Sequence, residues 1–424
     1  MHYYIFQDLN EILLSIANKF KPNNPEETVE RLNSFLSKIF RIQIYKYTVF
    51  DFMEDEENKK MVYLSSDQLR NLLTNDYNQF LDELETHGII EITEKYFKYG
   101  KYFKLVVLSG KALNSVRNSS SIGFKRVRTA LRNYYKSKYN KINGVDKQVF
   151  NMLWRLKIRI TEEDIREELE IRYPKYLAEK DEYFKNLATK KELKRGISIM
   201  SKEKYIDQST FYYDYITMWN NSNKIEKSSF FSIDTFGNRF HSIFTTLPSF
   251  FRKYIKLDGS NDIIGLDLGQ SQPTILSKIV LDEIGNNDFI DAVNNGDVYS
   301  SYPYERSNSK KQFLRSIFSN RFSGSFLELS SQFPQLGQFI LDIQNIRLYR
   351  DGERIEPYKN TSCLLQRFES RIFRKIWDKL LKAEIQFINV HDGIYVSKEK
   401  ENETRLIMEE VLSAELKGIK FTIK

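Results

Sequence analysis

Residues 387–396, FINVHDGIYV, contain two short apolar runs on either side of His391, Asp392 and Gly393. Apolar and β-branched residues around so short a polar centre are typical of two buried strands joined by a tight turn. A carboxylate at such a turn costs free energy unless it is solvated, paired or bound to a metal ion. The pattern therefore makes Asp392 a candidate metal ligand.

A second apolar run leads to another carboxylate, Asp267, within NDIIGLDLGQSQPTIL at residues 261–276. The pattern predicts a buried strand that ends at Asp267, followed by a tight turn into a helix. Taken alone, each aspartate is more typical of a capped turn than of a metal site. If the two strands are neighbours, however, the carboxylates lie a few ångströms apart. They could then hold two Mg²⁺ or Mn²⁺ ions about 3.5–4 Å from each other.

The N-terminal part has the pattern of a winged helix-turn-helix. A helical segment and a strand at residues 40–50 come first, and a helix pair and a β-hairpin follow. The apolar faces of the two helices are Leu69, Leu72 and Leu73, then Phe80, Leu81 and Leu84. Gly88 ends the second helix, and the hairpin turns near Gly100.

Several lysines, among them Lys98 and Lys101, occur along this hairpin beside tyrosines. Such a cationic patch attracts nucleic-acid phosphates, which favours contact with DNA. The alternative is a winged helix that binds protein and whose lysines are merely solvated.

The pattern changes twice more along the chain. Residues 111–230 are helical, charged and at first strongly basic, which favours a linker or thumb. From residue 231 onward charge density falls and β-branched and aromatic residues increase. We therefore predict an α+β protein with domains at 1–110, 111–230 and 231–424.

Composition narrows the class of partner. The 65 basic and 57 acidic residues give a formal charge of +8, which favours a polyanionic ligand. The single cysteine, Cys363, excludes an internal disulfide and indicates a reducing compartment. No apolar run of about 18 residues occurs, so we expect a cytoplasmic protein that does not enter a membrane. We also expect a monomer.

Five segments, in order, resemble the palm and fingers of family A DNA polymerases and the related phage-type single-subunit RNA polymerases. GLDLGQSQPTIL resembles motif A of that family, and NVHDGIYV resembles motif C. YERSNSKKQFLRSIFSNRFSG resembles motif B, and FIDAVNNGDVYSSY resembles the segment before the fingers helix. TFGNRFHSIFTTLPSFFR resembles the segment that contacts primer–template. The resemblance implies a compact phage or mobile-element polymerase with an N-terminal winged helix. Its palm would contain an antiparallel sheet, and its helical fingers would be reduced.

The resemblance implies roles for particular residues. Asp267 and Asp392 would be catalytic and would hold two Mg²⁺ or Mn²⁺ ions together with Leu268. The nucleotide-binding residues would be Arg306, Lys310, Lys311, Phe318 and Gln272. The residues that bind primer–template would be Arg239, His241, Thr245, Arg252, Gln366 and His391. The competing interpretations are an ordinary amphipathic helix at 306–318, a surface arginine at 239 and a structural histidine at 391.

Three departures from the family leave the sugar specificity open. Motif B ends in Phe318-Ser319 instead of Tyr-Gly. Gln272 replaces the glutamate that excludes ribose, and Gly393 stands where a third acid is common. We see no proofreading exonuclease motif.

The function predicted is template-directed nucleotidyl transfer from a nucleoside triphosphate to a primer in phage, plasmid or mobile-element replication. DNA primer–template and nucleoside triphosphates would be the partners, with RNA also possible. One alternative is a primase or RNA polymerase on the same scaffold. The other is a non-enzymatic winged-helix replication initiator.

Overall fold

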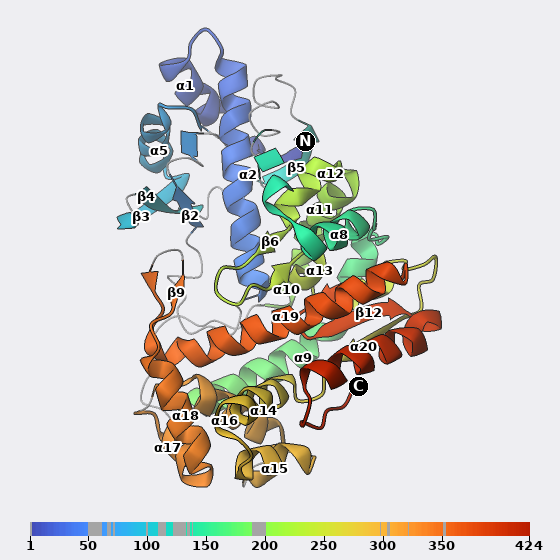
Figure 1. Ribbon diagram of the computed structural model, residues 1–424. Coiled ribbons are helices and arrows are strands. Elements are labelled where there is room, and N and C mark those ends of the chain that lie inside the picture. Colours follow the sequence, from blue (N-terminus) through green and yellow to red (C-terminus); the bar gives the residue numbers. More distant parts are fainter. Residues whose placement is uncertain are drawn as a thin grey trace. The chain divides into compact units, whose positions relative to one another are not determined.

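The structure is a computed structural model in which the chain forms two compact units, each described here by itself (Figure 1). The first unit contains Met1–Lys141, Lys157–Ser229 and Thr246–Tyr254, and the second contains Ile142–Leu156, Phe230–Thr245 and Ile255–Lys424. The described residues are 2–49, 62–65, 69–70, 73–98, 101–108, 116–121, 133, 136–137, 139–188, 201–296, 298–302, 306–320, 322–350 and 353–424.

The first unit combines helices with two small antiparallel sheets. Its strands are β1 (His2–Phe6), β2 (Val62–Ser65), β3 (Ile90–Lys98), β4 (Lys101–Leu108) and β5 (Val116–Ser121). Its α-helices are α1 (Asn10–Phe20), α2 (Pro25–Val49), α5 (Tyr77–Thr86), α9 (Glu162–Ala188), α10 (Lys202–Ile206), α11 (Gln208–Asn221) and α12 (Lys224–Lys227). Its 3₁₀ helices include η1 (Gln7–Leu9) and η3 (Ser249–Tyr254), and η2 (Ser228–Phe230) crosses into the second unit.

The three-stranded sheet of the first unit has the strand order β2-β4-β3, with all neighbours antiparallel. Its strand β2 precedes α5 in the chain, and β3 and β4 follow it. Lys98 pairs with Lys101, so the predicted β-hairpin is confirmed. Phe80, Leu81 and Leu84 on α5 are buried, which confirms the apolar face predicted for the second helix. Leu72, predicted for the first helix, lies outside the described residues.

The strand predicted at residues 40–50 is wrong, because α2 continues as a helix to Val49. That prediction rested on the β-branched and aromatic residues of this segment, whose preference for strands is weak and depends on context. Extending an existing helix adds a hydrogen bond for each residue fixed, so continuing α2 requires no new nucleus.

The second unit consists mainly of helices around one three-stranded sheet. Its strands are β6 (Ser232–Ile233), β7 (Phe240–His241), β8 (Ile263–Asp267), β9 (Tyr349–Arg350), β10 (Glu353–Arg354), β11 (Ile388–Val390) and β12 (Gly393–Ser397). Its α-helices are α8 (Gly144–Leu153), α13 (Ile243–Thr246), α14 (Ser271–Ile284), α15 (Asp288–Asn294), α16 (Arg306–Phe318), α17 (Gly324–Gln332), α18 (Pro334–Asn345), α19 (Asn360–Lys382) and α20 (Glu401–Glu415). Its 3₁₀ helices are η4 (Val298–Ser301), η5 (Pro357–Lys359) and η6 (Lys398–Lys400).

The three-stranded sheet has the order β11-β12-β8, and both pairings are antiparallel. Val390 pairs with Gly393 across the two-residue connection His391-Asp392, so the predicted pair of strands with a tight turn is confirmed. The predicted strand ending at Asp267 is also confirmed. It is less buried than expected, since only Leu266 among its residues is fully covered.

Helix α19 organises the core of the second unit. It packs against α8, α14, α16, α18 and α20, and α20 also covers β8 and β12 (Figure 1). The buried Glu369 fills the gap between Leu365 and Ile372 in the series of the helix's buried apolar residues: Cys363, Leu365, Ile372, Phe373, Ile376, Trp377 and Leu380. This spacing places them along one side of the helix.

The coarse prediction of an α+β protein is confirmed, and three consecutive domains stay a prediction. Among the described helices, none is both long and apolar enough to cross a membrane.

Candidate functional site

The structure brings Asp267 and Asp392 together at one end of the three-stranded sheet. Gly393, which follows Asp392, pairs with Asp267 across β12 and β8. The main-chain N–H of Leu268 donates to the main-chain oxygen of Asp392 at 3.2 Å. Asp267 is exposed and Asp392 is half-buried. The two aspartates therefore lie beside each other in space, where a ligand can reach their carboxylates.

Gly393 has a steric reason to be glycine. A Cβ atom added there would lie 1.9 Å from Oδ1 of Asp267 and 3.3 Å from the main-chain oxygen of Val390. The Asp267 carboxylate thus occupies the space that a side chain at residue 393 would need. The acid common at this place in the resembling family could not fit beside Asp267 in this arrangement.

The main chain around Asp267 is held from its other side as well. Asp267 and Lys424 exchange N–H···O bonds of 3.1 and 2.9 Å, and Gly269 donates to Thr422 at 2.8 Å. Gln270 has a φ of 49° and donates through Nε2 to the main-chain oxygen of Gly296 at 2.5 Å. These contacts fix the tight turn between β8 and α14, as the sequence predicted.

Glu369 on α19 is a member of the site that the sequence analysis missed. Its oxygen Oε1 accepts from Nε and Nη2 of Arg239 at 3.0 and 2.7 Å. Oε2 accepts from Nε2 of Gln272 at 2.8 Å and from the hydroxyl of Ser271 at 3.3 Å. The residue is 1% exposed. One detectable signal was a carboxylate at a core position of α19, four residues after Leu365 and four before Phe373.

Burial is the main reason that the pKa of Glu369 rises from 4.5 to about 7. The positive charge of Arg239 opposes this rise, and the negative charge of Asp392 adds to it. The effect of Asp392 places Glu369 and Asp392 in one electrostatic environment.

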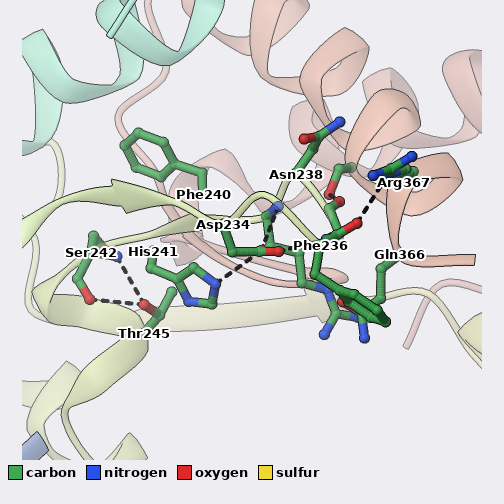
Figure 2. A network of polar contacts seen from close by, with 12 residues as sticks. Asp234, Phe236, Asn238, Phe240, His241, Ser242, Thr245, Gln366 and Arg367 are labelled. Carbon is green, nitrogen blue, oxygen red and sulfur yellow. Dashed lines mark hydrogen bonds and ion pairs between the residues drawn. The ribbon is translucent and has the colours of Figure 1, made fainter. Parts of the chain in front are cut away.

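The β6–β7 hairpin carries Arg239, which donates to Glu369, and His241, which lies beside Asp234 (Figure 2). Asp234 accepts from the main-chain N–H of Gly237 at 2.5 Å and of Arg239 at 2.8 Å. Its Oδ2 lies 3.2 Å from Nε2 of His241. Burial favours a higher pKa for Asp234, but these hydrogen bonds outweigh it and lower the pKa to about 2. Asp234 therefore stays ionised and holds the hairpin in shape.

Several predicted contacts for nucleic acid meet at this hairpin. The rings of His241 and His391 are in edge contact, with centroids 5.6 Å apart. Gln366 packs on Gly237, where an added Cβ would lie 2.3 Å from Oε1 of Gln366. The hydroxyl of Thr245 accepts from the main-chain N–H of Ser242 and donates to the main-chain oxygen of Ser242, so it stabilises its own turn (Figure 2). Thr245 is therefore a structural residue as well as a candidate contact.

The predicted triphosphate-binding helix exists as α16 and packs against α17 and α19. Lys310 and Lys311 are exposed, and Phe318 is half-buried. The inward-facing residues of the amphipathic interpretation, Phe313 and Ile317, are fully buried. The side chain of Arg306 lies outside the described residues.

Three predicted nucleic-acid contacts lie in the first unit. Lys98 ends β3 and Lys101 begins β4, and the side chains of both are outside the described residues. Arg252 lies in η3. These residues stay predictions.

The donors at the carboxylate pair fit a hard divalent cation. Asp267 and Asp392 offer carboxylate oxygens, and Leu268 can contribute only its main-chain carbonyl. Within the described ranges, no group of three or more His, Cys, Asp or Glu residues converges in a way that could hold a metal ion. Such an ion would therefore rely on two carboxylates and on substrate phosphates, an arrangement usual for Mg²⁺.

Comparison with known proteins adds no relative: no protein-family model matches the sequence, and no curated protein matches it significantly. Function is therefore inferred from the geometry of this chain's own residues.

Replacing Gly393 should disturb the carboxylate pair. We expect Gly393→Ala to weaken Mn²⁺ binding by about tenfold or more, because the new methyl group displaces the Asp267 carboxylate. Titration followed by electron paramagnetic resonance measures this. Gly324→Ala is the matched control, since nothing lies within 4 Å of a Cβ at that position. Equal Mn²⁺ affinity in both variants would contradict the assignment.

Glu369 should make stability depend on pH. Because its pKa is about 7 in the folded chain and near 4.5 otherwise, folding takes up a proton between these values. This contribution is complete below pH 4.5 and is lost as the pH rises through 7. We expect the wild type to lose up to about 3 kcal/mol relative to Glu369→Gln between pH 5 and 8.

Urea denaturation at a series of pH values measures this loss. Glu409→Gln, at an exposed position of α20, is the control and should give a difference that hardly varies with pH. A Glu369→Gln difference that is equally flat would show that Glu369 is ionised throughout.

Proposed function

We propose that the second unit catalyses template-directed nucleotidyl transfer. The observation that supports this most strongly is the pairing of Gly393 with Asp267, which sets Asp267 and Asp392 side by side and within reach of solvent. A pair of accessible carboxylates on neighbouring strands is suited to two divalent cations. The order of the five resembling segments supports a family A polymerase in particular.

In this reaction the 3′-oxygen of a primer forms a bond to the α-phosphorus, and the bond to pyrophosphate breaks. Two Mg²⁺ ions, when bound, supply activation of the 3′-hydroxyl and neutralise charge on the triphosphate. Asp267 and Asp392 would hold them, with the carbonyl of Leu268. Lys310, exposed on α16, would bind the triphosphate together with Arg306 or Lys311.

Residues around Glu369 would position the primer–template. Arg239 uses Nε and Nη2 for Glu369, which leaves Nη1 as a further donor. Such a donor suits the acceptors that every base pair offers in the minor groove. His241 on β7, His391 in the turn before β12, and Gln366 on α19 beside Gly237 would contact the backbone near the primer end.

The first unit would dock nucleic acid. The helix α5, followed by the β3–β4 hairpin of the antiparallel β2-β4-β3 sheet, supports a winged helix, with Lys98 and Lys101 at the tip of the hairpin. Helices α9 to α12 would act as a thumb. Replication of a phage, plasmid or other mobile element is the proposed setting.

A second candidate is RNA synthesis at the same site, as in a primase or single-subunit RNA polymerase. Gln272 donates to Glu369, and its Oε1 is buried without a hydrogen-bond partner in the described structure. A buried acceptor without a donor is costly, and a ribose hydroxyl would supply one. This observation favours use of ribonucleotides beside or instead of deoxynucleotides.

The carboxylate pair can be tested by single substitutions. We expect Asp267→Asn and Asp392→Asn each to lower nucleotide incorporation by at least about a thousandfold, because each removes a charged metal ligand. Duplex binding should be unchanged in both. Primer extension and fluorescence anisotropy measure the two effects.

The control is Asp262→Asn, which alters an exposed carboxylate just before β8. It should retain full incorporation. Full activity in both Asp267→Asn and Asp392→Asn would refute the proposed function.

The choice of sugar and the need for a primer can be tested separately by varying the nucleotides and the primer. We expect the wild type to extend a primer with labelled ribonucleotides as well as deoxynucleotides, since Gln272 offers an acceptor to the 2′-hydroxyl. Parallel reactions with each nucleotide set, with and without primer, measure this. Strict rejection of ribonucleotides would remove the second candidate and leave the first.

A further inference from the structure

A groove of about 830 Å³ lies along α19 in the second unit, outside the carboxylate site. One wall carries Arg367, Phe368, Arg371 and Arg374 of α19, and Asp282 and Glu283 from the end of α14 line it as well. At 3.6 residues per turn, Arg367 and Arg371 lie on the side of α19 nearly opposite to Glu369, and Phe368 lies about 100° around the helix from it. The groove is therefore a separate feature from the Glu369 network.

Arg367 and Arg371 keep their positive charge available. Arg367 donates from Nε to the carbonyl of Phe236 at 2.9 Å and from Nη2 to the carbonyl of Thr235 at 3.4 Å (Figure 2). Carbonyl groups orient a guanidinium without neutralising it. Arg371 is exposed and lies over the ring of Phe368, 4.4 Å from its centroid. In the described part of the chain, Arg371 has no salt bridge.

Most acids at the groove already have partners. Asp146 is occupied by Arg374, with N···O distances of 2.9 and 3.0 Å. Asp282 pairs with Lys278 at 2.5 Å. The groove lining holds three carboxylates, Asp146, Asp282 and Glu283, and three arginines. With Lys278 counted beside its partner Asp282, one net positive charge remains at the groove.

An aromatic face beside two such guanidinium groups suits a ligand that combines flat rings with anions. A single strand of nucleic acid has this composition, because its bases are free to stack and its phosphates follow the chain. A duplex keeps its bases paired inside and offers none to Phe368. We propose that this groove binds single-stranded nucleic acid, with a base stacked on the Phe368–Arg371 pair and phosphates at Arg367 and Arg371.

The proposal does not require the carboxylate pair to be catalytic. A polymerase would need such a groove for unpaired template or a displaced strand, and a replication initiator would need it for opened DNA. The axial distance from Arg367 to Arg374 is about 10 Å, which a few nucleotides can follow.

The test is anisotropy of a labelled 12-residue oligothymidylate with the full chain at fixed salt and in EDTA. We expect Phe368→Ala and Arg371→Ala each to weaken single-strand binding by about fivefold or more. Lys379→Ala, which removes a charge from the same helix outside the groove, should leave it unchanged. Circular dichroism melting verifies that each variant folds, and Phe368→Leu and Arg371→Gln replace any that does not.

A hairpin duplex of the same length should show no such loss in either variant, and oligouridylate distinguishes RNA from DNA as the preferred strand. Wild-type affinity for single strands in the Phe368 and Arg371 variants would overturn the proposal, as would an equal loss for the duplex. Since no nucleoside triphosphate or free metal ion is present, the result does not depend on whether the chain catalyses nucleotidyl transfer.

Discussion

Glu369 places a carboxylate where almost no water reaches it, and its hydrogen-bond partners come from two other segments of the chain. Arg239 is supplied by the β6–β7 hairpin, and Ser271 and Gln272 are supplied by the first turn of α14. An unpaired charge at this depth would cost several kilocalories per mole, so the three segments are stable only together. Because α14 begins directly after the turn at Asp267, this network also positions the strand end that carries Asp267.

The carboxylate pair depends on a second constraint, the absence of a side chain at residue 393. Oδ1 of Asp267 occupies the space next to that residue, so this position of the Asp267 carboxylate requires glycine at residue 393. The departure from the resembling family at Gly393 thus follows from the arrangement of Asp267. The same reasoning connects Gln272 with Glu369, since its amide donates to the buried carboxylate.

Local patterns in the sequence predicted both strand ends, the turn at His391-Asp392 and the β3–β4 hairpin, because apolar runs and turn residues determine these elements nearby. The role of Glu369 required the packing of α19 against the hairpin and α14, which no local pattern contains. At residues 40–50 the local pattern predicted the wrong element, because side chains that favour strands continue a helix there. Arg239 was predicted as a contact for nucleic acid, whereas its ion pair with Glu369 became visible only in the fold.

The most direct test of nucleotidyl transfer is extension of an end-labelled primer on a template by the wild-type chain, with Mg²⁺ and with a chelator. We predict products lengthened by the nucleotides that the template specifies, formed only with the divalent cation. Absence of any product with deoxynucleotides or ribonucleotides, with or without primer and with either Mg²⁺ or Mn²⁺, would contradict it.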